Sequence, residues 1–88
     1  MSNSETVIKF KSIQNEGFEL FKKKNADYGN AFEDCGVIGI LVRINDKIRR
    51  MQNISKTSIT IIDSESLRDT LIDLQNYATL AILELDRK

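Results

Sequence analysis

The stretch that decides the fold reads GVIGILVRINDKIRRM, from Gly36 to Met51. Apolar side chains recur in it every three or four residues, which is the spacing of one face of an α-helix. Two glycines, Gly36 and Gly39, stand near its start, and each costs about 1 kcal/mol of helix propensity relative to alanine. We therefore expect a helix over residues 32–51 with a kink near the glycines and an apolar stripe made of Val37, Ile40, Leu41, Ile44, Ile48 and Met51.

Apolar residues also recur at helical spacing in the part of the chain that precedes this stretch. Residues 4–24 read as a first helix that Asn3 or Ser4 caps and that Gly17 bends, because these residue types favour those positions. The segment 25–30 is dense in turn-forming residues and predicts the break between the first two helices. The apolar face of the first helix consists of Val7, Phe10, Ile13, Phe18 and Phe21.

A third helix is expected over residues 64–85, after a connection over residues 53–62 that we interpret as an extended loop or, alternatively, a short strand. Its main apolar stripe consists of Leu67, Leu71, Leu74, Ala78, Ala81 and Leu85. A second apolar set, on other faces, consists of Ile72, Leu80, Ile82 and Leu83. Three helices leave that second set without an internal partner, so we expect a dimer or higher homo-oligomer built through this helix.

Composition restricts the class of protein. The 88 residues include no proline and are 41% apolar, which is typical of one small all-α domain over residues 1–88. No apolar run approaches the roughly 18 residues of a membrane span and no secretion signal is present, so we expect no membrane partner and a cytoplasmic location. The single cysteine, Cys35, is expected in the core, in a reducing compartment. The absence of histidine excludes histidine-based acid–base catalysis, histidine-ligated zinc and cysteine–histidine nucleophile pairs.

Charge is distributed unevenly along the chain. Residues 1–56 carry 10 basic and 7 acidic side chains, a net charge of +3, whereas residues 57–88 carry 3 and 6, a net charge of −3. The overall balance of zero argues against duplex nucleic acid as a partner. A molecule polarised in this way can still offer a local pocket for an anion.

The densest polar cluster is the block KNADYGN, which begins at Lys24. Asn25 and Asp27 can hydrogen-bond the edge of a base or cap a helix, and Tyr28 can stack on a base. The block can equally be a turn between helices with its capping residues. The four phenylalanines are expected first in a core or interface, and a base-stacking role for one of them remains an alternative.

A second polar block lies in the middle helix, where residues three or four apart share a flank of the helix. Such a flank can address a phosphate or a carboxylate, or it can be a solvated face held by weak ion pairs. Its members are Arg43, Asp46, Lys47 and Arg50.

Acidic residues recur one turn apart on the third helix, where Asp69 and Asp73 follow Glu65. Carboxylates at this spacing repel one another unless a cation lies among them. That cation can be an arginine or lysine of the middle helix, which is the simpler interpretation, or Mg²⁺.

Taken together, the two polar blocks and the third helix resemble the first nucleotide-modification-associated domain family of bacteria and phages, over roughly residues 18–85. The family is similar to the all-α nucleoside triphosphate pyrophosphatases, which include MazG. The resemblance implies a helical assembly that oligomerises and holds a nucleotide between helices. It implies ligand contacts at Asn25, Asp27, Tyr28, Arg43, Asp46, Lys47, Asp69 and Asp73.

Those pyrophosphatases hold Mg²⁺ with an E-x-x-E pair on one helix and an E-x-x-D pair on the next, and this sequence departs from both patterns. We therefore expect binding without catalysis and without a cofactor. Small all-helical phage oligomers that sequester nucleotide messengers of bacterial immunity are similar in size and charge balance. By that analogy we expect a phage-associated, oligomeric protein that binds a nucleotide or cyclic-nucleotide signal of host immunity.

Residue roles follow from this hypothesis. Arg43, Lys47 and Arg50 would meet phosphate, and Tyr28 would stack on a base. Asn25 and Asp27 would read base or ribose. One alternative is a Mg²⁺-dependent nucleoside triphosphate pyrophosphatase linked to modified-nucleotide metabolism. Its metal would be held by Asp46, Asp69 and Asp73. The other alternative is a helical protein-interaction module.

Overall fold

Three helices make up the described part of the protomer. The computed structural model describes residues 2–57 and 63–87, and the side chains of residues 25–35, 54–57 and 63–66 are not described. The helices are α1 (Asn3–Lys23), α2 (Asn25–Thr57) and α3 (Asp63–Asp86). The described residues contain no strand, so the predicted all-α, three-helix protomer is confirmed. The predicted bounds of α1 and α3 are off by one residue at each end, whereas α2 is longer than predicted at both ends.

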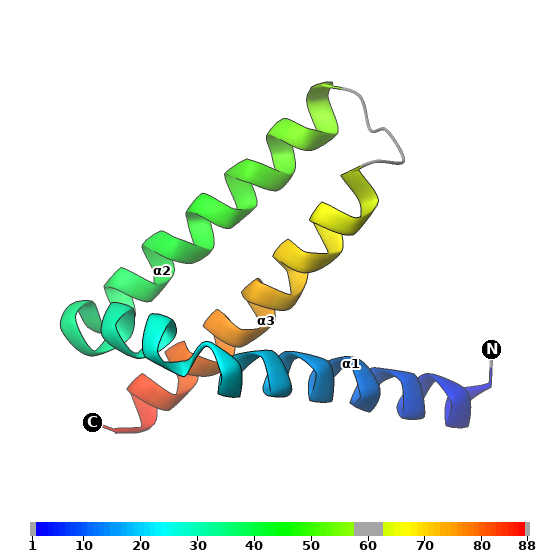
Figure 1. Cartoon of the computed structure of the whole chain (residues 1–88), viewed down its shortest axis with the longest axis horizontal. Coiled ribbons are helices and arrows are strands. Elements are labelled where there is room, and N and C mark those ends of the chain that lie inside the picture. Colours follow the sequence, from blue (N-terminus) through cyan, green and yellow to red (C-terminus); the bar gives the residue numbers. More distant parts are fainter. Residues whose placement is uncertain (1, 58–62, 88) are drawn as a thin grey trace.

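α2 and α3 lie antiparallel, and α1 crosses α3 toward the carboxyl-terminal end of that helix (Figure 1). The amino-terminal half of α1 projects past the other two helices. The radius of gyration is 14.7 Å, larger than the roughly 12 Å expected of a compact chain of this length. The protomer is therefore an open shape that exposes much of α1.

The chain changes direction at two places before α3. Lys24 alone separates α1 from α2, and its N–H still donates to the Leu20 carbonyl at 3.0 Å. The predicted turn over residues 25–30 is wrong, because asparagine and aspartate favour helix starts as well as turns and α2 begins at Asn25. The predicted kink is confirmed at Gly36, where φ is 63° and ψ is −157°. Only glycine adopts that backbone region readily.

The start of α1 differs from the prediction by one or two residues. Ser2, rather than Asn3 or Ser4, is the cap, because its backbone is extended and its Oγ accepts the Glu5 N–H at 3.2 Å. α1 continues through Gly17 without interruption. Gly17 is the buried residue of α1.

The hydrophobic core lies between α2 and α3. Ile40 is buried against Leu80 and Ala81, and three half-buried side chains pack on this cluster: Phe21, Ile44 and Tyr77. Phe21 belongs to α1, so the carboxyl-terminal end of α1 joins the core. The other members of its predicted apolar face, from Val7 to Phe18, are exposed.

The predicted core face of α3 is partly wrong. Leu71 and Leu85 are 50% and 56% exposed, whereas Ile72 and Leu80, which the sequence pattern leaves without an internal partner, are buried. The reason is that α1 and α2 cover two adjacent sides of α3, so its covered surface is wider than one stripe. Thr70 and Asn76 are buried polar residues of this surface.

Several predictions fall outside the described part of the chain. These concern the side chains of Cys35 and Phe32 and residues 58–62 of the predicted loop. The first part of that loop is helical, because α2 continues to Thr57. Among the described helices, none has both the length and the apolar character that a membrane span requires.

Candidate functional site

The crossing of α1 and α3 is made by a close approach of their backbones. Asn76 on α3 is 7% exposed, and its Nδ2 donates to the carbonyl oxygen of Gly17 at 3.0 Å. A Cβ atom at Gly17 would collide with the Gln75 side chain and lie 3.1 Å from Asn76 Oδ1. Glycine at this position therefore allows the helices to meet, and the Asn76 amide fixes where they meet.

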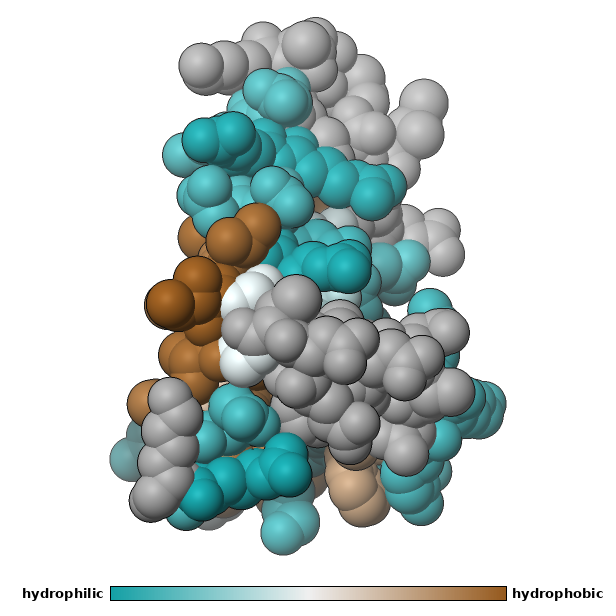
Figure 2. Space-filling model, turned by 90° about the vertical axis from the view of Figure 1, so that its left-hand side faces the viewer, coloured by the Kyte–Doolittle hydropathy of each residue, from teal (hydrophilic) through white to brown (hydrophobic). Residues whose placement is uncertain are grey.

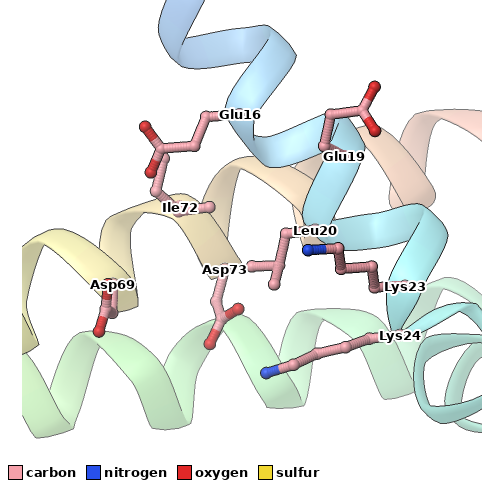
Figure 3. Close-up of a pocket in the computed structure, with 8 residues that line it drawn as sticks. All are labelled: Glu16, Glu19, Leu20, Lys23, Lys24, Asp69, Ile72 and Asp73. Carbon is pink, nitrogen blue, oxygen red and sulfur yellow. The ribbon is translucent and has the colours of Figure 1, made fainter.

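A pocket of about 430 Å³ opens on one side of this crossing, and we call it the charged pocket (Figure 3). One wall of the pocket consists of α3 residues that precede Asn76 in the chain. The opposite wall consists of residues at the carboxyl-terminal end of α1. The residues that line it are Glu16, Glu19, Leu20, Lys23, Lys24, Asp69, Ile72 and Asp73.

Three of its four carboxylates are paired with cations that do not line the pocket. Glu19 pairs with Lys22 at 3.2 Å and Asp73 with Lys47 at 3.3 Å. Arg68 binds both carboxylate oxygens of Glu16, at 2.5 and 2.8 Å. Asp69 then remains as the acid of the lining that has no ion pair with a described residue, and the two ammonium groups of the lining belong to Lys23 and Lys24.

The Glu16–Arg68 pair is the shortest described contact between charged side chains. The hydrogen bonds from Arg68 lower the pKa of the Glu16 carboxyl, and the same bonds raise the pKa of Arg68. Asp69 adds to the second effect through its charge. Both partners are about half exposed, so solvent screens the pair and its contribution to stability is small.

The Lys47–Asp73 pair lies at the junction between α2 and α3 rather than on an outer flank. The side chains of Lys47 and Asp73 are only 25% and 26% exposed. Lys47 therefore reaches a carboxylate of α3, which agrees with the interpretation that a basic residue of the middle helix neutralises the acidic series. Its predicted neighbours on that flank, Arg43, Asp46 and Arg50, are exposed and do not line the charged pocket.

The structure thus brings together only part of the predicted site. Lys24, Asp69 and Asp73 line the charged pocket, and Lys47 contacts it through Asp73. Asn25, Asp27 and Tyr28 lie in α2, but their side chains are outside the described ones. Among the described residues, no three carboxylate or thiol side chains form a metal-binding cluster, so Asp46, Asp69 and Asp73 are not gathered as one.

The contribution of α1 is missing from the sequence prediction. Four lining residues that were not predicted belong to α1, namely Glu16, Glu19, Leu20 and Lys23, and the predicted Lys24 follows directly after the helix. These positions follow the spacing i, i+3, i+4, i+7 and i+8, which places them on one face of a helix. That periodicity is visible in the sequence, but a mixed-charge helix face is ordinarily a solvated one.

Comparison with known proteins identifies the family. Residues 24–85, which are 62 of the 88, match the family described as nucleotide modification associated domain 1. No curated protein and no solved structure matches the chain. The chain belongs to the nucleotide modification associated domain 1 family, as the sequence resemblance implies.

Proposed function

We propose that this member of the nucleotide modification associated domain 1 family is a homo-oligomeric protein that binds a nucleotide without hydrolysing it. The phosphate of the ligand occupies the charged pocket at its Lys23 and Lys24 end. The ligand we favour is a nucleotide or cyclic-nucleotide signal of host immunity, bound by a phage protein that sequesters it. The family description supports the nucleotide-related part of this proposal.

The observation that carries the proposal is the distribution of charge in the pocket. The pocket has more acids than bases, which would repel a phosphate if all charges acted freely. However, Arg68, Lys22 and Lys47 neutralise three of the carboxylates from outside the lining. The two lysines then outweigh the one remaining carboxylate, Asp69, and the pocket can accept an anion.

Asp69 has a separate role in this proposal. Its carboxylate is exposed, and it lines the pocket on the α3 wall opposite the lysines (Figure 3). A carboxylate accepts hydrogen bonds and does not donate them. It therefore suits the hydroxyl groups of a ribose whose phosphate lies at the lysine end.

Oligomerisation is supported by the apolar surface that the protomer leaves exposed. Figure 2 shows apolar side chains gathered on one face. Thirteen large hydrophobic side chains of the described residues are at least 39% exposed, and they include Phe10 on α1, Ile38 on α2 and Ile82 on α3. Surfaces of this kind mark contacts with other chains. A second copy is the occupant we propose, and it would place the ligand at or near a subunit interface.

The proposal is tested by thermal stabilisation and calorimetry with mono-, tri- and cyclic nucleotides, each with and without Mg²⁺. Binding at about 100 times the Kd adds about 2.7 kcal/mol of stability. Lys24→Gln is expected to weaken the binding of every phosphate-bearing ligand at least about tenfold, because it removes a charge-assisted contact to the phosphate. The matched control is Lys11→Gln, because Lys11 is exposed on the projecting half of α1, and this variant should bind normally.

Three results would contradict the proposal. One is binding that Lys24→Gln leaves unchanged. Another is the release of pyrophosphate from triphosphates in the presence of Mg²⁺, which would establish the hydrolytic alternative. The third is a monomer without nucleotide affinity in light scattering and calorimetry, which would favour a protein-interaction module.

A further inference from the structure

A second pocket, of about 330 Å³, opens on the other side of the crossing between α1 and α3, and we call it the neutral pocket. Its α3 wall begins at Gln75 and continues toward the carboxyl end of the helix, and no charged side chain lines it. The lining residues are Gln14, Phe18, Phe21, Gln75, Asn76, Thr79, Leu80 and Leu83.

The walls of the neutral pocket suit a flat ring. Phe18 and Phe21 come from α1, and Leu80 and Leu83 face them from α3. Leu80 belongs to the buried core, so the inner wall of the pocket is the core itself. The ammonium of Lys22 lies 5.0 Å from the centre of the Phe18 ring, and the Phe18 side chain is 54% exposed, so part of the ring is accessible to a ligand.

Polar groups at the pocket are neutral and offer both donors and acceptors. The carboxamides of Gln14 and Gln75 make no hydrogen bond with the described residues, and each can donate and accept. The Thr79 hydroxyl donates to the Gln75 carbonyl at 2.9 Å, so its oxygen remains an acceptor. A ring whose edge carries both donors and acceptors matches this set, whereas a phosphate finds no cation in the lining.

We infer that the neutral pocket binds a nucleobase by stacking on phenylalanine and by hydrogen bonds to the glutamine carboxamides. The inference rests on the proposed function for its class of ligand. It adds a base site that is separate from the phosphate site, because the two pockets lie on opposite sides of the crossing. One protomer can therefore hold an uncharged nucleoside without using Lys24.

The test uses the fluorescent nucleoside 2-aminopurine riboside together with adenosine, guanosine, cytidine and uridine, none of which carries a phosphate. Gln14→Leu is expected to weaken binding about tenfold, because it removes a hydrogen-bonding carboxamide from an exposed position. The matched control, Gln52→Leu, changes an exposed glutamine of α2 outside the pocket and should bind normally.

A second variant fills the pocket. Thr79 is exposed, so Thr79→Trp should fold normally by circular dichroism and abolish nucleoside binding. If this variant does not fold, the comparison of Gln14→Leu with Gln52→Leu decides the question.

Four results would overturn the inference. The first is the absence of binding to every nucleoside, and the second is unchanged nucleoside binding in Gln14→Leu. The third is binding of toluene that is as tight as binding of the nucleosides. The fourth is a change of oligomeric mass in Thr79→Trp while nucleoside binding stays intact. The last would make the pocket a contact with a second copy. Nucleotide binding that depends on Lys24, without nucleoside binding, would overturn this inference and leave the proposed function standing.

Discussion

The side-chain amide of Asn76 holds α3 against the backbone of α1 at Gly17, and both residues are buried at the point of contact. The two pockets open on either side of this contact. Asn76 therefore supports the walls of both pockets without being an exposed ligand group itself.

Gly17→Ala tests how tightly the helices approach. Alanine gains about 1 kcal/mol of helix propensity, but overpacking costs about 1–3 kcal/mol. The Gln75 amide can move aside, whereas Asn76 cannot move without losing its bond to Gly17. We expect a net loss of about 1 kcal/mol in urea unfolding, and the double variant with Gln75→Ala should not restore it, because the remaining conflict is with Asn76. A Gly17→Ala variant that is more stable than the wild type would contradict the close approach.

Gly36→Ala tests the kink in α2. Apart from the adjoining helix backbone, no atom of the described residues lies within 4 Å of where the Cβ would be, so the expected cost comes from the backbone conformation. We expect a loss of about 1–3 kcal/mol in urea unfolding, because φ of 63° with ψ of −157° is disfavoured for L-residues.

A control for this prediction uses D-alanine at position 36, introduced by chemical synthesis. The mirror image of the Gly36 backbone is close to polyproline II, which is an allowed conformation. D-Alanine should therefore restore the stability that L-alanine loses. Equal stability of the two forms would show that the kink does not persist in solution.

The Glu16–Arg68 pair predicts that the stability of the folded protein depends on pH. The pKa of Glu16 is lowered from 4.5 in the folded state, so the contribution of the pair is fully present at neutral pH. It is lost as the pH falls through the lowered folded pKa, because the carboxyl becomes protonated. The Tm difference between the wild type and Glu16→Gln should be present at neutral pH and vanish in strong acid, below the folded pKa.

The size of that difference should be small and should decrease at high salt, because the pair is exposed. Asp46→Asn is the control, since Asp46 is an exposed acid of α2 whose substitution leaves the Glu16–Arg68 contact in place. A difference that persists unchanged in strong acid would show that Glu16 acts through packing rather than charge.

The helices and the kink could be predicted from the sequence, because apolar spacing, the absence of proline and the position of Gly36 are local signals. The family could be predicted because the two polar blocks and the third helix resemble it. The face of α3 that the other helices cover could not be predicted from the sequence. Leu71 and Ile72 are equally apolar, and only the crossing of α1 decides that Ile72 is buried and Leu71 exposed. In the same way, nothing local distinguishes Asn76 from a solvated asparagine.

The candidate site could be predicted only in part, for the same reason. The one-turn spacing of Asp69 and Asp73 places both on one face, and both line the charged pocket. Glu16, Glu19 and Lys23 escape prediction because a pocket wall on α1 exists only once α1 lies across α3.

The ion pair between Lys47 and Asp73 also has a consequence for the alignment of α2 with α3. Lys47 follows Ile40 by seven residues, and Asp73 precedes Leu80 by seven, so the ion pair and the core contact occupy one seam two turns apart. If either helix slid by one turn, Lys47 would face Thr70 or Tyr77 and Asp73 would lose its cation in a half-buried place. The pair thus penalises misaligned hairpins, and it selects one register among several that the apolar residues alone would allow.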